Sequence, residues 1–98
     1  MTHPIYRVTA CHVVGPTTLN VQFDDASVQT IDFAPVLYGA LFGPLRDPVV
    51  FRQAHVDPEV HTVVWPNGAD FDPATLHDWP THVDALRTLA SRWKQGAA

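Results

Sequence analysis

The sequence predicts an α+β fold: a small antiparallel sheet covered by short helices, with an amphipathic helix near the C-terminus. Three segments in the first third of the chain alternate apolar and polar residues, which is the period of a β-strand. The turns between them are too short for parallel strands, whose connections need about a dozen residues. Residues 81–94 instead repeat apolar side chains every three or four positions, as an amphipathic helix does.

The alternation predicts a three-strand meander at residues 6–14, 18–23 and 28–33. In the first strand it places His12 on the apolar face with Val8, as a core histidine, and Cys11 on the opposite face. We expect Cys11 to be a small half-buried hydrophobe, because no neighbouring cation would activate it as a nucleophile.

The middle of the chain is predicted to be irregular. Proline and glycine interrupt residues 33–53 too often for one long helix, so we expect short helical turns across one face of the sheet. Asp47 before Pro48 is typical of a helix N-cap followed by the first helical residue. A second strand pair is predicted at residues 54–56 and 62–65.

Two more helix starts are predicted in the last third. Asp72 before Pro73 indicates an N-cap, and Thr81 with Asp84 three positions later resembles a capping box. The apolar stripe of the final helix consists of Val83, Leu86, Leu89, Ala90 and Trp93. This stripe could dock a partner or close a homodimer, but we favour packing on the protein's own sheet.

Composition and charge limit the possible functions. The 98 residues are 46% hydrophobic and 16% charged, which is the balance of one globular domain spanning residues 1–98. Six scattered basic residues against ten acidic ones give a net charge of −4, so we expect no direct nucleic-acid binding. The one cysteine excludes an internal disulfide, and no segment resembles a secretory signal or a membrane span. We therefore expect a cytoplasmic protein that uses no cofactor.

Two groups of residues are candidates for chemistry. His55, Asp57, Glu59 and His61 would share one face of a continuous strand, and these side chains suit zinc or manganese. Pro58 favours a solvated turn at this point, which would scatter the four side chains. The second group, candidate binding residues, consists of Trp65, Asn67, Asp70 and Asp72.

The second group has two interpretations. Asp70 and Asp72 are paired carboxylates, which can do acid–base chemistry. A turn at Asn67 and a helix cap at Asp72 explain the same residues without any substrate. We predict no catalytic residue, since the two serines lie outside any nucleophile elbow and His77 and His82 have no metal-ligand spacing.

Four blocks of sequence, taken in order, resemble the bacterial domain of unknown function 2442 family over about residues 6–76. They are Leu19–Asp25, Ile31–Phe33, Gly43–Phe51 and Val63–Asp70, the last being the most specific. The resemblance implies a small α+β domain in which short helices cover a sheet. One member carries a helix-turn-helix module and has been described as DNA-binding, whereas others stand alone and resemble one half of two-gene toxin–antitoxin modules. Residues 81–94 are an addition, and they leave no room for a helix-turn-helix.

We therefore expect a non-enzymatic interaction or regulatory module that binds a small basic protein, as an antitoxin-like half of a two-gene module. The alternative is a small metal-dependent enzyme or ligand-binding protein that uses the two candidate groups. A third hypothesis is a transcriptional regulator that acts beside a separate DNA-binding chain.

Overall fold

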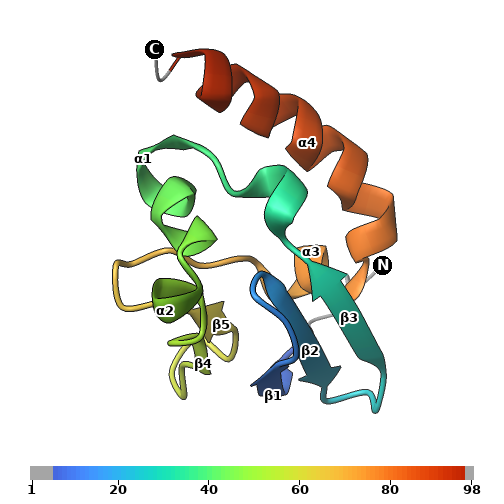
Figure 1. Cartoon of the computed structure of the whole chain (residues 1–98). Coiled ribbons are helices and arrows are strands. Elements are labelled where there is room, and N and C mark those ends of the chain that lie inside the picture. The colour runs from blue at the N-terminus through green and yellow to red at the C-terminus, as the bar shows by residue number, and fades with distance from the viewer. Residues whose placement is uncertain (1–5, 97–98) are drawn as a thin grey trace.

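The computed structural model describes residues 6–96, with side chains up to Arg92, and has the predicted α+β architecture (Figure 1). Three strands form an antiparallel sheet in the order β1-β2-β3. A second antiparallel pair consists of β4 and β5. The strands are β1 (Val8–Val13), β2 (Thr18–Phe23), β3 (Val28–Asp32), β4 (His55–Val56) and β5 (Val63–Val64).

The β2 alternation is confirmed, since Leu19, Val21 and Phe23 are all buried. β1 differs, because its register against β2 shifts by one residue between Val8 and Ala10. Such a bulge adds one residue to the strand and reverses the faces of the residues that follow it.

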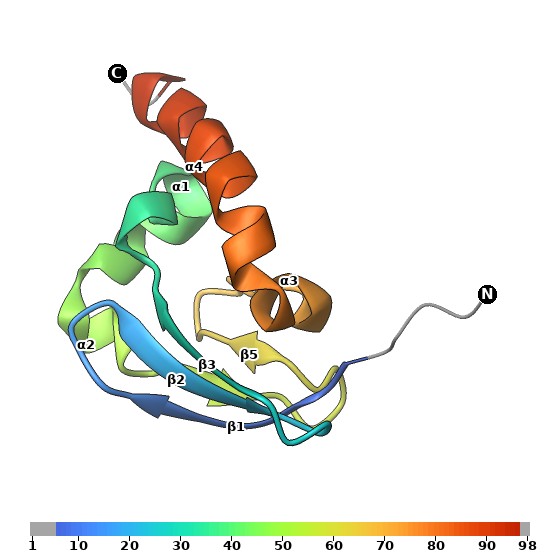
Figure 2. The ribbon, with the colours of Figure 1, turned by 90° about the vertical axis from the view of Figure 1, so that its right-hand side faces the viewer.

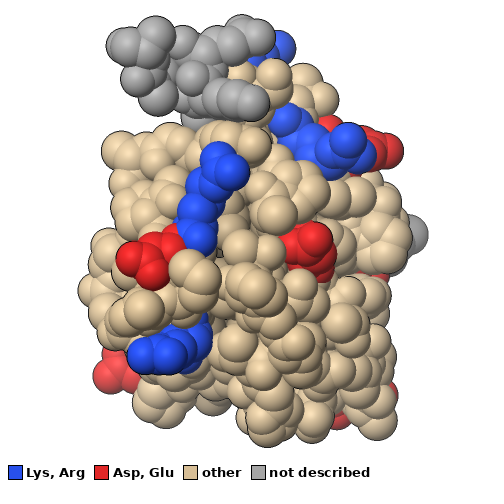
Figure 3. Space-filling model, in the orientation of Figure 1, with Lys and Arg blue, Asp and Glu red and all other residues tan. Residues whose placement is uncertain are grey.

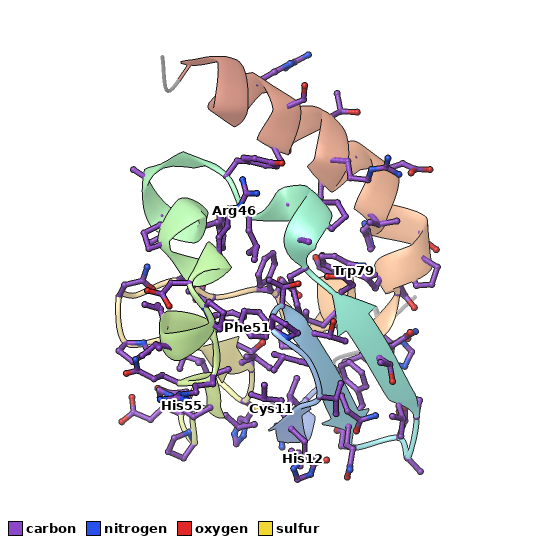
Figure 4. The ribbon with its side chains drawn as sticks, viewed as in Figure 1. Cys11, His12, Arg46, Phe51, His55 and Trp79 are labelled. Carbon is purple, nitrogen blue, oxygen red and sulfur yellow. The ribbon has the colours of Figure 1, made fainter. Side chains whose placement is uncertain are left out.

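The bulge overturns one prediction in β1. His12 is exposed rather than buried in the core, and Figure 4 shows it pointing away from the helices. Cys11 instead packs against the core, where burial raises the pKa of its thiol. A thiol with a raised pKa is a poor nucleophile, as expected for a small hydrophobe.

Short helices cover one face of the sheet (Figure 2). They are η1 (Ala34–Val36), α1 (Gly39–Phe42), η2 (Gly43–Arg46), α2 (Pro48–Phe51) and α3 (Pro73–His77). Both predicted aspartate caps are present: an Asp47 carboxylate oxygen accepts the Val49 N–H at 2.9 Å, and one of Asp72 accepts the Ala74 N–H at 2.8 Å. The predicted run of short helical turns is confirmed.

The final helix, α4 (Trp79–Gly96), begins two residues before the predicted start. Thr81 lies in its first turn, where its N–H donates to the Asp78 carbonyl at 2.8 Å, so the capping-box prediction is wrong. Pro80 has no N–H to satisfy and fits the first turn of a helix, which lets α4 start before it.

α4 lies across η1, α1 and α3 rather than on the sheet, which corrects the expected packing partner (Figure 2). Val83 and Leu86 pack against the core, and Ala90 is buried. Leu89 is 41% exposed, and the side chain of Trp93 lies outside the described residues. Part of the predicted apolar stripe is therefore used within the domain.

The core centres on Phe33, which is fully buried just after β3. Its ring centroid lies 5.9 Å from those of Phe51 and Trp65. It lies 5.2 Å from Phe71 and 5.1 Å from Trp79, and Figure 4 labels Phe51 and Trp79 within the fold. This aromatic cluster joins the sheet to α2, β5 and α4.

Candidate functional site

The predicted binding residues begin with Trp65 and Asn67, and both make contacts within the fold. Trp65 is 2% exposed, and its indole Nε1 donates to the Phe51 carbonyl at 2.8 Å. Asn67 Nδ2 donates to the Leu41 carbonyl at 2.9 Å, and its Oδ1 accepts the Ala69 N–H at 3.1 Å. These side chains fasten the loop after β5 to α1 and α2.

The two carboxylates of this group lie in different settings. Asp72 caps α3, as described above, with its carboxylate on the Ala74 N–H. Asp70 is exposed, and its backbone pairs with Val64 in an isolated antiparallel bridge. A buried tryptophan, two structural polar residues and one exposed aspartate are more typical of a folding motif than of a catalytic group.

The loop between β4 and β5 is a tight turn around Asp57. Its Oδ1 accepts the backbone N–H of Glu59 at 2.7 Å and of Val60 at 3.2 Å. These hydrogen bonds lower the pKa of Asp57. His61 has a left-handed backbone, with φ of 54°, and its N–H donates to the Asp57 carbonyl at 2.9 Å. The predicted turn is confirmed.

This turn separates the candidate metal ligands. His55 is exposed on β4 (Figure 4), and Asp57 uses its carboxylate to hold the turn. Among the described residues, no group of three or more histidine, cysteine or acidic side chains is arranged to hold a metal ion. The arrangement of His55, Asp57, Glu59 and His61 thus gives no support to a shared metal centre.

A cleft does bring together one residue from each candidate group. It has a volume of about 440 Å³, and its floor joins the chain before β1, the β4–β5 loop and the start of α3. Its lining residues are Tyr6, Arg7, Val60, His61, Asp72, Pro73 and Ala74. Side chains that can donate, accept and stack therefore line one small surface hollow.

His77, at the end of α3, was set aside by sequence reasoning, but its ring makes four contacts. Its ring stacks on Tyr6 with centroids 3.7 Å apart and meets the Phe23 ring edge-on at 5.0 Å. Its Nε2 lies 2.7 Å from a carboxylate oxygen of Asp25, and its Nδ1 lies 2.9 Å from one of Asp78. His77 thus bridges the β2–β3 turn and the α3–α4 junction.

The two carboxylates favour the protonated imidazole. Burial alone would lower the pKa of His77, but hydrogen bonds to Asp78 and Asp25 outweigh it, so the pKa is raised. Hydrogen bonds from Ser27, together with the contact to His77, lower the pKa of Asp25 to about 2. The bridge is therefore an ion pair at pH values below the raised pKa of His77 and above the lowered pKa of Asp25.

Asp25 and Asp78 belong to a local concentration of negative charge. Asp24 is the neighbour of Asp25 in the β2–β3 turn, and its Oδ1 accepts the backbone N–H of Arg7 at 3.2 Å. We call Asp24, Asp25 and Asp78 the acidic end of the sheet. Asp25 and His77 are far apart in the sequence, so no local spacing could have indicated this cluster.

Comparison with known families identifies the family of this chain. Residues 8–82 match the model of a family described as Protein of unknown function (DUF2442). The chain belongs to the DUF2442 family. The match extends from β1 through α3 into the first turn of α4, slightly beyond the segment that the sequence blocks cover. No curated protein and no solved structure matches the chain significantly.

DUF2442 membership gives a family but no activity. The most specific block of the DUF2442 resemblance, Val63–Asp70, contains the buried Trp65 and the turn that Asn67 fastens to α1. Among the helices that the structure describes, none is long and apolar enough to cross a membrane.

Proposed function

We propose that this chain is a non-enzymatic interaction module that binds a basic protein partner. The observation that carries the proposal is the acidic end of the sheet. Asp25 and Asp78, from two separate parts of the chain, both contact His77 there, and Asp24 adjoins Asp25, so three carboxylates outnumber the one imidazole in a protein whose net charge is −4. Opposite charge on the partner would speed association and select against acidic competitors.

The arrangement of the other polar groups supports the same proposal. Asn67, Asp57 and Asp72 satisfy backbone groups of their own loops and helices. On the face drawn in Figure 3, basic side chains stand apart from one another, which disfavours a nucleic-acid surface. A protein partner uses the negative charge that the described surface offers.

The test is mild affinity purification from the host lysate at low and at high salt, followed by mass spectrometry. We expect one basic protein at stoichiometric level at low salt and its loss at high salt, since salt screens exposed charges. Asp24→Asn with Asp78→Asn should weaken retention, because two charges of the acidic end are removed. Asp84→Asn removes an exposed charge on α4 and is the matched control.

A finer assignment follows if the partner is encoded beside this chain. The pair would then form a two-gene module of the toxin–antitoxin type, with this chain as the antitoxin-like half. Expression of the partner alone should slow growth, and co-expression of this chain should restore it. Equal growth with and without this chain would contradict the antitoxin role and leave partner binding intact.

A second candidate function is the binding of a small ligand in the cleft, because His61 and Asp72 line it together with Arg7 and Tyr6. Elemental analysis of untagged protein tests for a metal, and calorimetric titration with zinc, manganese and small carboxylic acids tests for ligands. His61→Gln should abolish any heat that arises in the cleft, whereas His12→Gln should leave it unchanged.

A further inference from the structure

The outer edge of β3 is the part of the sheet that is open to another chain. β3 is an edge strand, and in the part of the chain that the structure describes no strand pairs with its outer side. Figures 1 and 2 agree that β3 is the outermost strand on the side away from β1. Two residues of the acidic end, Asp24 and Asp25, lie at one end of this edge, in the turn that precedes β3.

The hydrogen-bond register shows which backbone groups point outward. The Phe23 N–H donates to the Ser27 carbonyl at 3.0 Å, and the Phe33 N–H donates to the Thr17 carbonyl at 2.8 Å. In an antiparallel ladder, hydrogen-bonded residue pairs alternate with pairs that are not hydrogen-bonded. Between these two ends, the backbone groups of Gln29 and Ile31 therefore bond to β2. The N–H and C=O groups of Val28, Thr30 and Asp32 therefore point to the open edge.

The edge lacks three of the features that protect edge strands from pairing, although its last residue, Asp32, is charged. Proline, lysine and bulges serve that purpose in other proteins, and β3 (Val28–Asp32) has none of them. β1, at the other side of the sheet, contains a bulge and borders the β4–β5 pair, where the Val8 N–H donates to the His61 carbonyl at 2.9 Å. Val28 adds an apolar contact to the edge, since it is 53% exposed.

Charge selects the occupant of the edge. Asp24 and Asp25 precede β3, and Asp32 is its last residue. The Gln29 side-chain amide donates a hydrogen bond to the His77 carbonyl at 2.8 Å, which places the next residue, Asp78, near β3. A second copy of this chain fits poorly, because symmetric antiparallel pairing about Thr30 would set Asp32 of each copy beside the acidic turn of the other. An extended segment with lysine or arginine side chains meets opposite charge at both ends.

We infer that the basic partner adds an extended strand to the outer edge of β3. This inference rests on the proposed function and specifies its mode of recognition. Main-chain hydrogen bonds to Val28, Thr30 and Asp32 provide the affinity, and cationic side chains near Asp24 and Asp32 set the register.

The experiment uses the partner protein retained in the purification described above, with binding measured by titration calorimetry. Thr30→Pro removes an N–H that β2 does not use, so the sheet should fold, but a strand can no longer pair there. We expect Thr30→Pro to weaken affinity by about tenfold or more. Amide exchange followed by NMR should show Val28, Thr30 and Asp32 exchanging in the free protein and protected in the complex, with Gln29 and Ile31 protected in both.

A matched pair of variants keeps the test informative if proline disturbs the fold. Thr30→Lys and Thr30→Glu change the same exposed side chain, and we expect lysine to weaken binding and glutamate to preserve or strengthen it. A retained partner whose affinity is the same for all Thr30 variants, with Val28, Thr30 and Asp32 amides still exchanging in the complex, overturns the edge inference while partner binding stands. Retention of no protein at stoichiometric level overturns both.

Discussion

The loop after β5 and the cluster around His77 differ in how their polar side chains are used. In the loop, Trp65 and Asn67 make hydrogen bonds to main-chain carbonyls of α2 and α1. In the cluster, His77 joins two exposed aspartates, Asp25 and Asp78, at the surface. The loop is therefore part of the structural framework, whereas the cluster forms a charged surface.

A distinctive sequence block therefore need not be the functional site. A rare residue type such as tryptophan is conspicuous in a sequence, and here its ring fills the core beside Phe33. The acidic end is made of common residues that only the fold brings together. Substitutions in the loop should therefore change stability, and substitutions in the cluster should change charge-dependent properties.

The largest expected effect is that of Trp65→Ala. Removing a buried indole leaves a cavity among Phe33, Phe51 and Phe71, which should lower the free energy of unfolding by about 3–5 kcal/mol. Urea unfolding followed by circular dichroism measures this change. Trp65→Phe keeps most of the apolar volume and loses only the hydrogen bond to the Phe51 carbonyl, so it should lower the free energy of unfolding by less. Equal stability of wild type and Trp65→Ala would contradict the structural role.

Gly68→Ala should give the next largest effect. Gly68 has φ of 90° in the turn after Trp65, and an added Cβ would meet no other atom within 4 Å. The cost is therefore backbone strain alone, about 1–2 kcal/mol. Gly43→Ala is the matched control, since Gly43 has φ of −54° and an added Cβ would lie 3.9 Å from Tyr38. It should leave the free energy of unfolding unchanged or raise it.

Asp72→Ala should have a smaller effect, because it removes one helix cap. Loss of the hydrogen bond to the Ala74 N–H should lower the free energy of unfolding by about 1 kcal/mol. Asp72→Asn keeps an accepting oxygen and should retain most of that stability. Asp70→Ala, at the neighbouring exposed aspartate, should change stability by less than about 0.5 kcal/mol. A larger loss for Asp70→Ala than for Asp72→Ala would reverse the assignment.

Much of the fold could be predicted because its signals are local. The alternation of β2 and the aspartate–proline starts of α2 and α3 each depend on a few neighbouring residues. The predicted start of α4 at Thr81 is wrong by two residues, because a proline fits the first turn of a helix and so does not prevent the helix from starting at Trp79. The bulge in β1 could not be predicted, since it depends on the register against β2 rather than on the residues of β1 alone.

The candidate site was less predictable for a physical reason. Trp65, Asn67 and Asp72 were singled out as residue types, but whether a polar group serves a ligand or the backbone depends on which partners surround it. His77 lies beside Asp78 in the sequence, so one of its two ion pairs joins neighbouring residues. Its contacts with Asp25 and Tyr6 arise only when α3 packs near the β2–β3 turn.

The smallest expected effect on stability at neutral pH comes from the His77 bridge, and it should depend on pH with a definite sign. The pKa of His77 is raised in the folded protein, so its contribution is complete below the pKa of a free histidine and is lost as pH rises through the folded value. The pKa of Asp25 is lowered to about 2, so its contribution is present above the pKa of a free aspartate and is lost as pH falls towards that value. The stability difference between wild type and His77→Gln should therefore be largest in mildly acidic solution and decline on both sides.

Urea unfolding at several pH values measures that difference, and His12→Gln, at an exposed histidine on β1, is the matched control. The His12 variant should track wild type across the range. A His77→Gln difference that stays constant with pH would mean that His77 acts through its ring contacts with Tyr6 and Phe23 and through uncharged hydrogen bonds. The bridge would then hold α3 to the β2–β3 turn without charge on His77, and no positive charge there would offset the carboxylates of Asp25 and Asp78 at neutral pH.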